Sequence, residues 1–417
     1  MNSSMHEKED ITLIYSKTVF LLYCIISFIS LTLDINQLFV RYPLVYLSIL
    51  ILIFLGIKDN EFKNIPSYLK RIFIIYWIYS IFIISYGLIL SESYWDYKNV
   101  FMSYVPYVFV SFGIFVGLNI EKYLTLLKFI IRRIFPITFI IGIIAYIFFY
   151  QSFYYSDFDH VLTRLTVPIF FFILAVPFLR LNYKIFIILF SIFHIMIDLE
   201  WRTSILRLSL CWSFVLIYLI CSFKNQIPKF IALLLFISPL FLLYSGISGK
   251  FDIFQYVAEG PEDNKYSLRG NTRSFLYEEV FQSLKEKDIN LLIGGGASNG
   301  YNTVFFSDAS ISQNTKQERY KSEVNFLNTL NQSGLIGLIL DMLIVLMPAL
   351  LAINRSNNDF SKLLGLYLFL SWVLFFLEMP QALNLNYFFN YIIIGICINN
   401  SFRKFNNAQI KFLFKSI

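Results

Sequence analysis

Apolar runs of about 20 residues, repeated from one end of the chain to the other, constrain this sequence more than any other feature. The hydrocarbon core of a bilayer is about 30 Å thick, and a helix needs about 20 apolar residues to cross it. The chain is 57% hydrophobic and 15% charged, whereas a soluble domain is about 25% charged. We therefore predict an all-α polytopic membrane protein, whose stability depends on helix packing in lipid.

The apolar runs and the polar breaks between them predict twelve transmembrane helices. They divide the chain into nine spans within 1–247, a long polar loop over 248–322, and three spans with a basic tail over 323–417. The predicted spans are residues 12–33, 38–57, 68–90, 99–118, 131–150, 163–180, 184–200, 203–222, 228–247, 324–352, 361–379 and 383–400.

The distribution of Lys and Arg predicts the orientation of these spans. With the N-terminus in the cytoplasm, twenty Lys and Arg fall in cytoplasmic segments and four in short outside loops. This bias is the one that membrane topology follows, so we expect both termini inside and the 248–322 loop outside. Topology thereby accounts for the net charge of +7, which gives no indication of nucleic acid binding.

The long polar loop is predicted to contain one amphipathic helix that lies over the spans with its apolar side down. Asn271 or Thr272 is a candidate N-cap for this helix. Residues 288–300 then have the composition of a turn-rich return. The apolar positions with helical spacing are Phe275, Leu276, Val280, Phe281 and Leu284.

Arg202 and Arg207 are candidate functional cations at the start of the eighth span. Arg202 lies at its outer end, and Arg207 is about 7–8 Å deeper in a regular helix. A cation near the middle of a bilayer costs at least about 2.5–3.5 kcal/mol, so it needs a partner or a cavity. The structural alternative is that Asp198 and Arg202, four residues apart, simply pair.

Arg273 and Arg269 are candidate anion-binding residues in the long loop. Arg273 falls in the first turn of the predicted loop helix, where free amides favour anions and a guanidinium adds a bidentate donor. The alternative for both is a solvated charge. Gly294, Gly295 and Gly296 could form an anion nest, for which a flexible turn is the commoner alternative.

Glu323 is a candidate general base at the outer start of the tenth span. A carboxylate there can accept a proton when burial raises its pKa. The alternative is that it caps the helix, because an acid in the first turn complements the helix dipole. Asn325, Asn328 and Gln332 share one face of this span, which predicts a polar seam rather than lipid contact.

Other polar residues support alternative functions. Asp157, Asp159 and His160 could hold a divalent metal, although short motifs of this kind are common by chance. His194 and Asp341 lie inside predicted spans and could relay protons in a transporter, or be satisfied by neighbouring helices. No nucleotide-binding motif is present, so neither ATP nor a sugar nucleotide is expected as the energy source.

The order of these motifs resembles that of the bacterial O-antigen polymerase and O-antigen ligase superfamily, usually called Wzy and WaaL. That family has an arginine opening a loop helix, Leu-(Leu/Phe)-Gly-x-Gly, a histidine or acid before an aromatic-Leu pair, and Gly-x-x-Gly entering a span. It also places an arginine at the outer start of a middle span. The corresponding residues here are Arg273, Leu291–Gly296, Glu323 with Phe326-Leu327, Gly334–Gly337, and Arg202-Thr203-Ser204.

The resemblance implies a metal-independent GT-C-type glycosyltransferase of the bacterial cytoplasmic membrane, without a cofactor. The donor would be a growing glycan on undecaprenyl pyrophosphate and the acceptor a repeat unit on the same carrier. The bilayer and a chain-length regulator are the other expected partners. Arg202 and Arg273 would neutralise the pyrophosphate leaving group, and Glu323 would accept the proton of the acceptor hydroxyl. Further candidates for substrate binding are Arg269, Arg207, Gly294, Gly296 and Asn325.

Two alternatives to a polymerase stay open. The ligases carry histidine where this chain has Glu323, which favours a polymerase over an O-antigen ligase. A flippase or transporter for lipid-linked oligosaccharides would place charges near mid-membrane, often in repeated halves with broken helices. Here the candidate charges gather at the outer face and no repeat is evident, which favours the enzyme.

Overall fold

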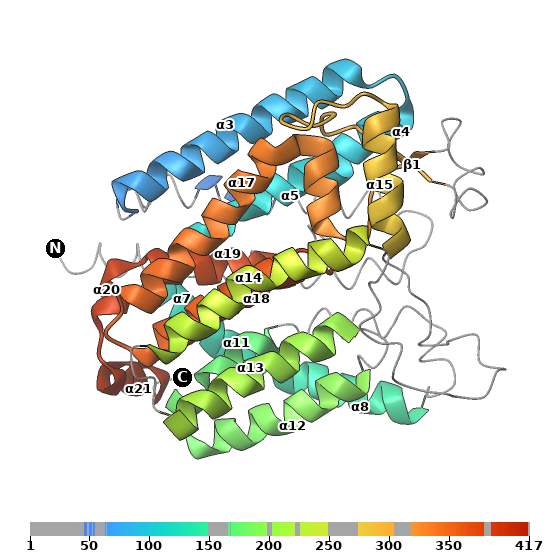
Figure 1. Cartoon of the computed structure of the whole chain (residues 1–417). Coiled ribbons are helices and arrows are strands. Elements are labelled where there is room, and N and C mark those ends of the chain that lie inside the picture. Colours follow the sequence, from blue (N-terminus) through green and yellow to red (C-terminus); the bar gives the residue numbers. More distant parts are fainter. Residues whose placement is uncertain are drawn as a thin grey trace.

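The computed structural model of the chain is an assembly of long helices, with one loop helix at one end (Figure 1). It describes residues 46, 47, 50, 51, 53, 54, 63, 65–148, 166, 168–197, 202–221, 226–248, 274–303, 318–378, 385–415. The statements below concern these residues.

Five of the described helices are long and apolar enough to cross a membrane. One of them is a continuous run in which α-helix alternates with a π-turn and a 3-10 turn; it contains α4 (Tyr94–Asn99), η2 (Val100–Tyr104), α5 (Val105–Phe109), η3 (Val110–Gly113) and α6 (Ile114–Gly117). The other four are α3 (Ser67–Leu90), α13 (Arg202–Cys221), α14 (Ile227–Ile247) and α17 (Asn325–Asn354).

Shorter elements complete the described part. Most are helices, and a two-stranded antiparallel ladder joins the loop segments. The helices are α7 (Ile120–Phe129), η4 (Ile130–Ile134), α8 (Phe135–Phe148), α11 (Ile169–Ala175), η5 (Val176–Phe178), α12 (Leu181–Ile197), α15 (Ser274–Glu286), α18 (Asp359–Leu374), α19 (Leu385–Ile398), α20 (Asn400–Lys404) and α21 (Asn407–Lys415). The strands are β1 (Tyr301–Asn302) and β2 (Glu318–Arg319).

The prediction of an all-α membrane protein is confirmed, and the helix bounds follow the apolar runs closely. The spans predicted at 68–90, 203–222 and 324–352 correspond to α3, α13 and α17. The count of twelve stays a prediction, because span 12–33 and most of 38–57 lie outside the described residues.

The centre of the bundle is α18, which is buried over almost its whole length against α17, α14 and α19. Helices nearer the outside expose large apolar side chains instead, such as Ile89 at 80% and Ile220 at 79% exposure. Exposed apolar faces of this kind are what a lipid-facing helix requires. Polar side chains that are buried inside the bundle therefore differ both from the apolar packing around α18 and from the apolar outer surface.

A break at Gly334 divides α17 into a short segment, Asn325–Ser333, and a long segment, 335–354. Gly334 has φ 63° and ψ −164°, which is not a helical conformation, and the two segments meet at an angle (Figure 1). The first amides of the short segment do not depend on a side-chain cap. They donate instead to carbonyls beyond the end of α18: Asn325 N to Glu378 O and Phe326 N to Phe375 O, both 3.0 Å.

The predicted amphipathic loop helix is confirmed as α15. Leu276, Tyr277, Val280 and Leu284 are buried, and the opposite side of the helix is exposed. Tyr277 donates a hydrogen bond of 2.9 Å to the carbonyl of Phe376. This contact fixes the loop helix to the segment that follows α18, beside the short segment of α17.

Candidate functional site

The glycine-rich segment at residues 291–296 hydrogen-bonds through its backbone to both segments of α17, on either side of the break at Gly334. Carbonyls at the end of the short segment accept hydrogen bonds from glycine amides, and amides at the start of the long segment donate to carbonyls just before the glycines. These are the groups that a helix end leaves without partners. The four bonds are Gly295 N to Asn331 O, Gly296 N to Gln332 O, Leu335 N to Leu291 O, each 2.9 Å, and Ile336 N to Leu292 O, 3.1 Å.

Glycine is required at two of these positions. Gly294 and Gly334 have φ of 81° and 63°, a region that other residues adopt only with strain. A Cβ on Gly294 would lie 2.6 Å from the carbonyl carbon of Gln332, and one on Gly334 would lie 2.6 Å from the amide nitrogen of Gly294. The two glycines therefore allow the loop and the broken helix to meet backbone against backbone.

The same hydrogen bonds bear on the predicted anion nest. Gly294 N donates to Asn290 O at 2.7 Å, so the amides of Gly294, Gly295 and Gly296 all donate to carbonyls of the chain. An anion would have to displace these bonds. The role predicted for Gly294 and Gly296 in substrate binding stays a prediction, and the role visible in the structure is to join the two segments of α17.

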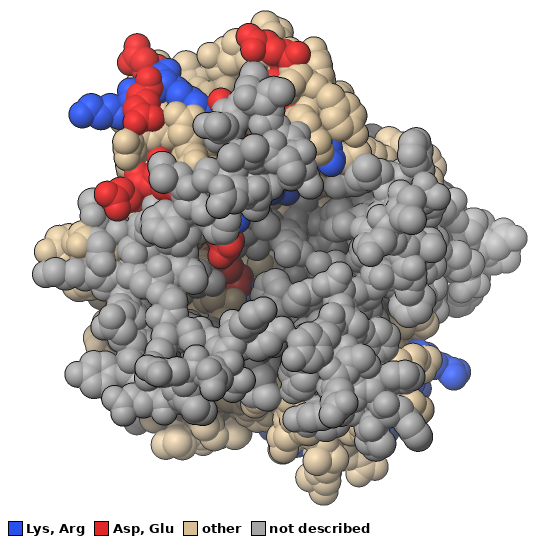
Figure 2. Space-filling model, turned by 90° about the vertical axis from the view of Figure 1, so that its right-hand side faces the viewer, with Lys and Arg blue, Asp and Glu red and all other residues tan. Residues whose placement is uncertain are grey.

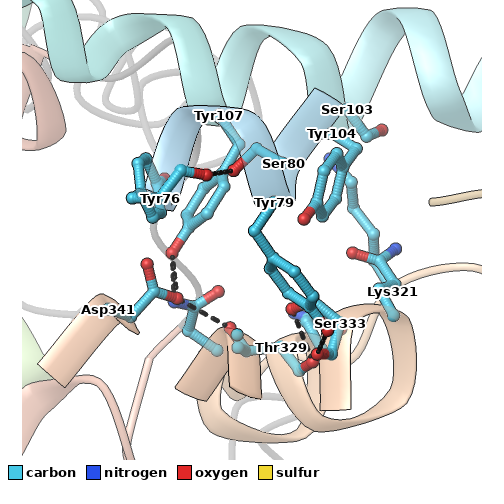
Figure 3. Close-up of a pocket in the computed structure, with 14 residues that line it drawn as sticks. Tyr76, Tyr79, Ser80, Ser103, Tyr104, Tyr107, Lys321, Thr329, Ser333 and Asp341 are labelled. Carbon is cyan, nitrogen blue, oxygen red and sulfur yellow. Dashed lines mark hydrogen bonds between the residues drawn. The ribbon is translucent and has the colours of Figure 1, made fainter. Parts of the chain in front are cut away.

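A polar pocket lies between the short segment of α17, α3 and the 94–117 helix run (Figure 3). Its empty volume, with the open mouth included, is about 600 Å³. The predicted polar seam is confirmed, since all three of its residues line this pocket. Those used below are Tyr76, Tyr79, Tyr104, Tyr107, Lys321, Asn325, Asn328, Thr329, Gln332 and Asp341.

Asp341 is the one carboxylate among the described residues that line this pocket, and it is 7% exposed. Its Oδ2 accepts hydrogen bonds from the Tyr107 hydroxyl at 3.2 Å and the Thr329 hydroxyl at 3.3 Å. Asn325 donates to the Tyr107 oxygen at 3.1 Å, and the Tyr107 ring stacks on Tyr387 at 4.9 Å. Within the described part of the chain, Oδ1 of Asp341 makes no hydrogen bond. Neighbouring helices thus satisfy one oxygen of this carboxylate and leave the other open.

Gln332 is a second buried polar group with an unused hydrogen-bonding capacity. It lines the pocket at 7% exposure. No residue that the structure describes makes a hydrogen bond to its side-chain amide, whereas the neighbouring Asn328 is engaged at both ends with the backbone of Ser322. Gln332 therefore lines the cavity with a side-chain amide, carrying two N–H donors and a carbonyl acceptor, that no described residue engages.

A second pocket adjoins the first and shares Tyr107 and Asp341 with it. It is also lined by Glu378 and Asn390 and has an empty volume of about 570 Å³. The Asn390 side-chain oxygen is buried without a hydrogen-bond partner among the described residues. Seen from the side of α15, the molecule is hollowed near its centre, and acidic side chains are visible in the hollow (Figure 2).

Arg207 is buried and has a partly buried partner, as its predicted depth in the membrane required. Its guanidinium pairs with Glu378, which lines the second pocket, and lies 5.2 Å over the ring of Phe170. Sequence reasoning missed Glu378. A signal was present, because this is a single acid at the end of the span predicted at 361–379, but its partner is distant in sequence.

Glu323 lies outside both pockets, and two expectations about it need correction. α17 begins at Asn325 and has no acid in its first turn, so the interpretation of Glu323 as a first-turn capping residue is wrong. Its side chain is 47% exposed and pairs with Arg319 at 3.3 Å, so the burial that the general-base interpretation assumed is not observed. Whether Glu323 accepts a proton stays a prediction.

His194 is satisfied by its neighbours. It is 1% exposed, and its two ring nitrogens lie 2.6 Å from the Thr166 hydroxyl and 2.9 Å from the Ser204 hydroxyl. These contacts support the structural alternative over a proton relay.

The remaining predicted site residues are not placed. Arg202 begins α13, but its side chain is not among those described, and Arg269 and Arg273 lie outside the described residues. The alternative metal site at 157–160 also lies outside them.

Comparisons of the chain with protein-family models, with curated proteins and with solved structures give no match. The site is therefore interpreted from its own residues.

Proposed function

We propose that this chain polymerises oligosaccharide repeat units carried on undecaprenyl pyrophosphate, as a metal-independent glycosyltransferase at the outer face of the bacterial cytoplasmic membrane. One observation carries most of the proposal. Two of the motifs that resemble the O-antigen polymerase superfamily, Leu291–Gly296 and Gly334–Gly337, are in direct backbone contact beside a polar pocket. Motifs far apart in sequence thus belong to one unit, which supports a shared function.

The proposed reaction is a displacement at the anomeric carbon of the donor glycan. The acceptor hydroxyl attacks this carbon, the bond to the pyrophosphate oxygen breaks, and the pyrophosphate leaves with the electron pair. Arg202 and Arg273 neutralise the negative charge that develops on the leaving group. Glu323 accepts the acceptor's proton. Because pyrophosphate is a good leaving group, positioning and charge neutralisation suffice.

The arginines provide the first test. Arg202→Ala and Arg273→Ala should abolish long glycan chains in the host cells and leave single-unit product, as read from the ladder on a gel. Arg355→Ala removes an exposed cation at the C-terminal end of α17 that lines neither pocket, and it should leave the ladder unchanged. An unchanged ladder in both test variants, at normal amounts of folded protein, would show that the proposed site is wrong.

Glu323→Gln tests the proton acceptor. The substitution keeps the shape of the side chain and removes its basicity, so long chains should be lost. The exposed pair with Arg319 stabilises the fold by at most about 1 kcal/mol, so the thermal unfolding temperature should not change. Near-normal polymer in this variant would exclude the base role. Activity that persists in excess chelator would likewise exclude the metal alternative at Asp157 and Asp159.

A lipid-linked oligosaccharide flippase is the second candidate, and two observations favour it. α17 is a broken helix, and Asp341 is a buried carboxylate close to the break; both features are typical of transporters. Purified protein in vesicles separates the candidates, because a flippase moves the lipid-linked sugar without changing its mass. A polymerase adds whole repeat units, and a ligase moves the glycan to a different acceptor.

A further inference from the structure

We propose that the pocket beneath the break in α17 binds the uncharged, hydroxyl-rich sugar of the acceptor, with Asp341 and Gln332 as its recognition residues. The open oxygen of Asp341 accepts a hydrogen bond from a sugar hydroxyl, and the Gln332 amide bonds a second polar group. The identity of the ligand as a sugar rests on the proposed function. The existence of the site rests on the geometry alone.

The first argument is the unused hydrogen-bonding capacity in the pocket. Asp341 and Gln332 are each only 7% exposed. In the described part of the chain, neither Oδ1 of Asp341 nor the Gln332 amide has a partner. Neither group is among the fully buried side-chain atoms that lack a partner, so each reaches the space of the cavity that both residues line. Two such groups in one cavity can both bond a polar ligand that takes the place of water.

The second argument is that the break at Gly334 creates this arrangement. Thr329 and Asp341 are twelve residues apart, and a continuous helix would separate them by about 18 Å along its axis. In the structure the Thr329 hydroxyl lies 3.3 Å from Oδ2 of Asp341. The short segment of α17 therefore folds back toward the long one, and the pocket lies at this bend.

The third argument concerns charge. Among the described lining residues, only Lys321 and Asp341 carry a charged side chain, and they lie at opposite sides of the pocket (Figure 3). A phosphate beside Asp341 would meet a like charge. Hydroxyls and amides make up most of the polar lining, and each can both donate and accept hydrogen bonds. This lining fits a neutral polyhydroxylated ligand.

The tyrosines add a surface for a sugar ring. Tyr76, Tyr79, Tyr104 and Tyr107 all line the pocket. A tyrosine offers an apolar ring face together with a hydroxyl at its edge. A sugar has the complementary character, with C–H groups on the faces of its ring and hydroxyls around the rim. The combination gives the pocket both contacts that a sugar needs.

The test measures the accessibility of Asp341 in the full-length protein in lipid nanodiscs. A hydrophobic carbodiimide adds to a protonated carboxyl without a leaving group, and the stable N-acylurea is located by mass spectrometry. The probes are octyl glycosides of glucose, galactose, mannose and N-acetylglucosamine. Octyl phosphate is the anionic probe with the same tail, and sodium chloride tests for a cation site.

We expect Asp341 to be modified without ligand and to be protected by at least one octyl glycoside. At a ligand concentration of about ten times Kd, mass action leaves about a tenth of the sites unbound, so modification should slow about tenfold. Gln332→Leu should abolish this protection. Gln282→Leu makes the same substitution at an exposed position of α15 that bonds Glu286, and it should retain the protection.

Several results would overturn the proposal. Lack of modification without ligand at every pH at which the protein stays folded would mean that the open oxygen of Asp341 is not reachable. Protection by octyl phosphate alone, or by sodium alone, would assign an anion or a cation to the pocket. Failure of every glycoside to protect, or protection that persists in Gln332→Leu, would place sugar binding elsewhere.

Failure of the sugar site and failure of the proposed polymerase would give different results. Glycoside protection together with normal ladders in both arginine variants would keep the sugar site and exclude the polymerase at the predicted arginines. Ladders that depend on the arginines, together with failure of all glycosides to protect Asp341, would keep the polymerase and exclude this acceptor site.

Discussion

Two buried polar clusters lie toward opposite ends of α17, and they differ in whether hydrogen-bonding groups without a described partner line a cavity. Near the end of α17, Asn358 donates to Phe402 O at 2.9 Å and accepts from Ser361 N at 2.7 Å. Asn399 donates to Leu118 O at 2.6 Å and accepts from Phe402 N at 3.0 Å. These amides cap helices and join three separate segments, so their role is structural. We call this group the closed cluster.

The pocket at the other end of α17 is organised differently. Asp341 is held through one oxygen, and its second oxygen and the Gln332 amide face a cavity. Unpaired atoms also occur near the closed cluster, where Ser361 Oγ and Arg403 Nε have no partner among the described residues, but these atoms are sealed from any surface. The two clusters therefore differ in where their unpaired groups lie. Unpaired groups that line a cavity are available to a ligand, and those sealed inside the bundle are not.

The largest effect on stability is expected from Gly294→Val, which disrupts the backbone contact between residues 291–296 and the two segments of α17. The positive φ costs about 1–3 kcal/mol, and the overlap with the Gln332 backbone costs at least another 1–3 kcal/mol. Folded protein should fall sharply, as measured by size-exclusion chromatography after heating. Gly300→Ala is the control, because its new Cβ would come no closer than 3.0 Å to the Glu318 side chain and 3.2 Å to the Arg319 carbonyl, which need to shift by only a few tenths of an ångström. Equal folded yields for the two variants would contradict the account.

Asn358→Ala should have the next largest effect, and only on stability. It removes a helix cap worth about 1 kcal/mol and leaves buried carbonyls without their donor, at about 1–3 kcal/mol. The unfolding temperature should fall, while polymer formed per folded molecule should not change. Loss of polymerisation at equal amounts of folded protein would mean that the closed cluster is part of the site.

Gln332→Leu should have the smallest effect on stability and a large effect on function. It replaces an unpaired buried amide, so the unfolding temperature should stay constant or rise. The glycan ladder should shorten, because a recognition group is lost. A fall in unfolding temperature as large as that of Asn358→Ala would show that Gln332 is structural and would remove the distinction between the two clusters.

Much of the fold could be predicted because it depends on a local property. An apolar run of sufficient length specifies a membrane helix whatever its partners are, so α3, α13 and α14 follow the predicted bounds closely. The loop helix α15 was equally visible, since its apolar positions recur with helical spacing. The break at Gly334 was not, because a single glycine inside an apolar run is compatible with a continuous membrane helix.

The site was predictable only in part, because it depends on pairs of residues that are distant in sequence. The polar seam of Asn325, Asn328 and Gln332 lies on one helix face, and periodicity was enough to find it. Glu378 pairs with Arg207 across 171 residues, and no local pattern connects them. Asp341 acquires Thr329 as a partner only through the break in the helix. Its position in the pocket could therefore not be read from spacing.

The most direct test of the central claim compares Asp341→Asn with Asp359→Asn in host cells at matched amounts of folded protein. In the Asp341→Asn variant, the new side-chain amide would direct its single oxygen toward the hydroxyls of Tyr107 and Thr329 and turn its nitrogen into the pocket. Asp359 bonds Lys362 at 2.8 Å and Asn407 at 2.7 Å, outside the pocket. We predict that Asp341→Asn leaves mainly single-unit product, whereas Asp359→Asn keeps the long chains. A full-length ladder in the Asp341→Asn variant would contradict the claim that this pocket holds the acceptor.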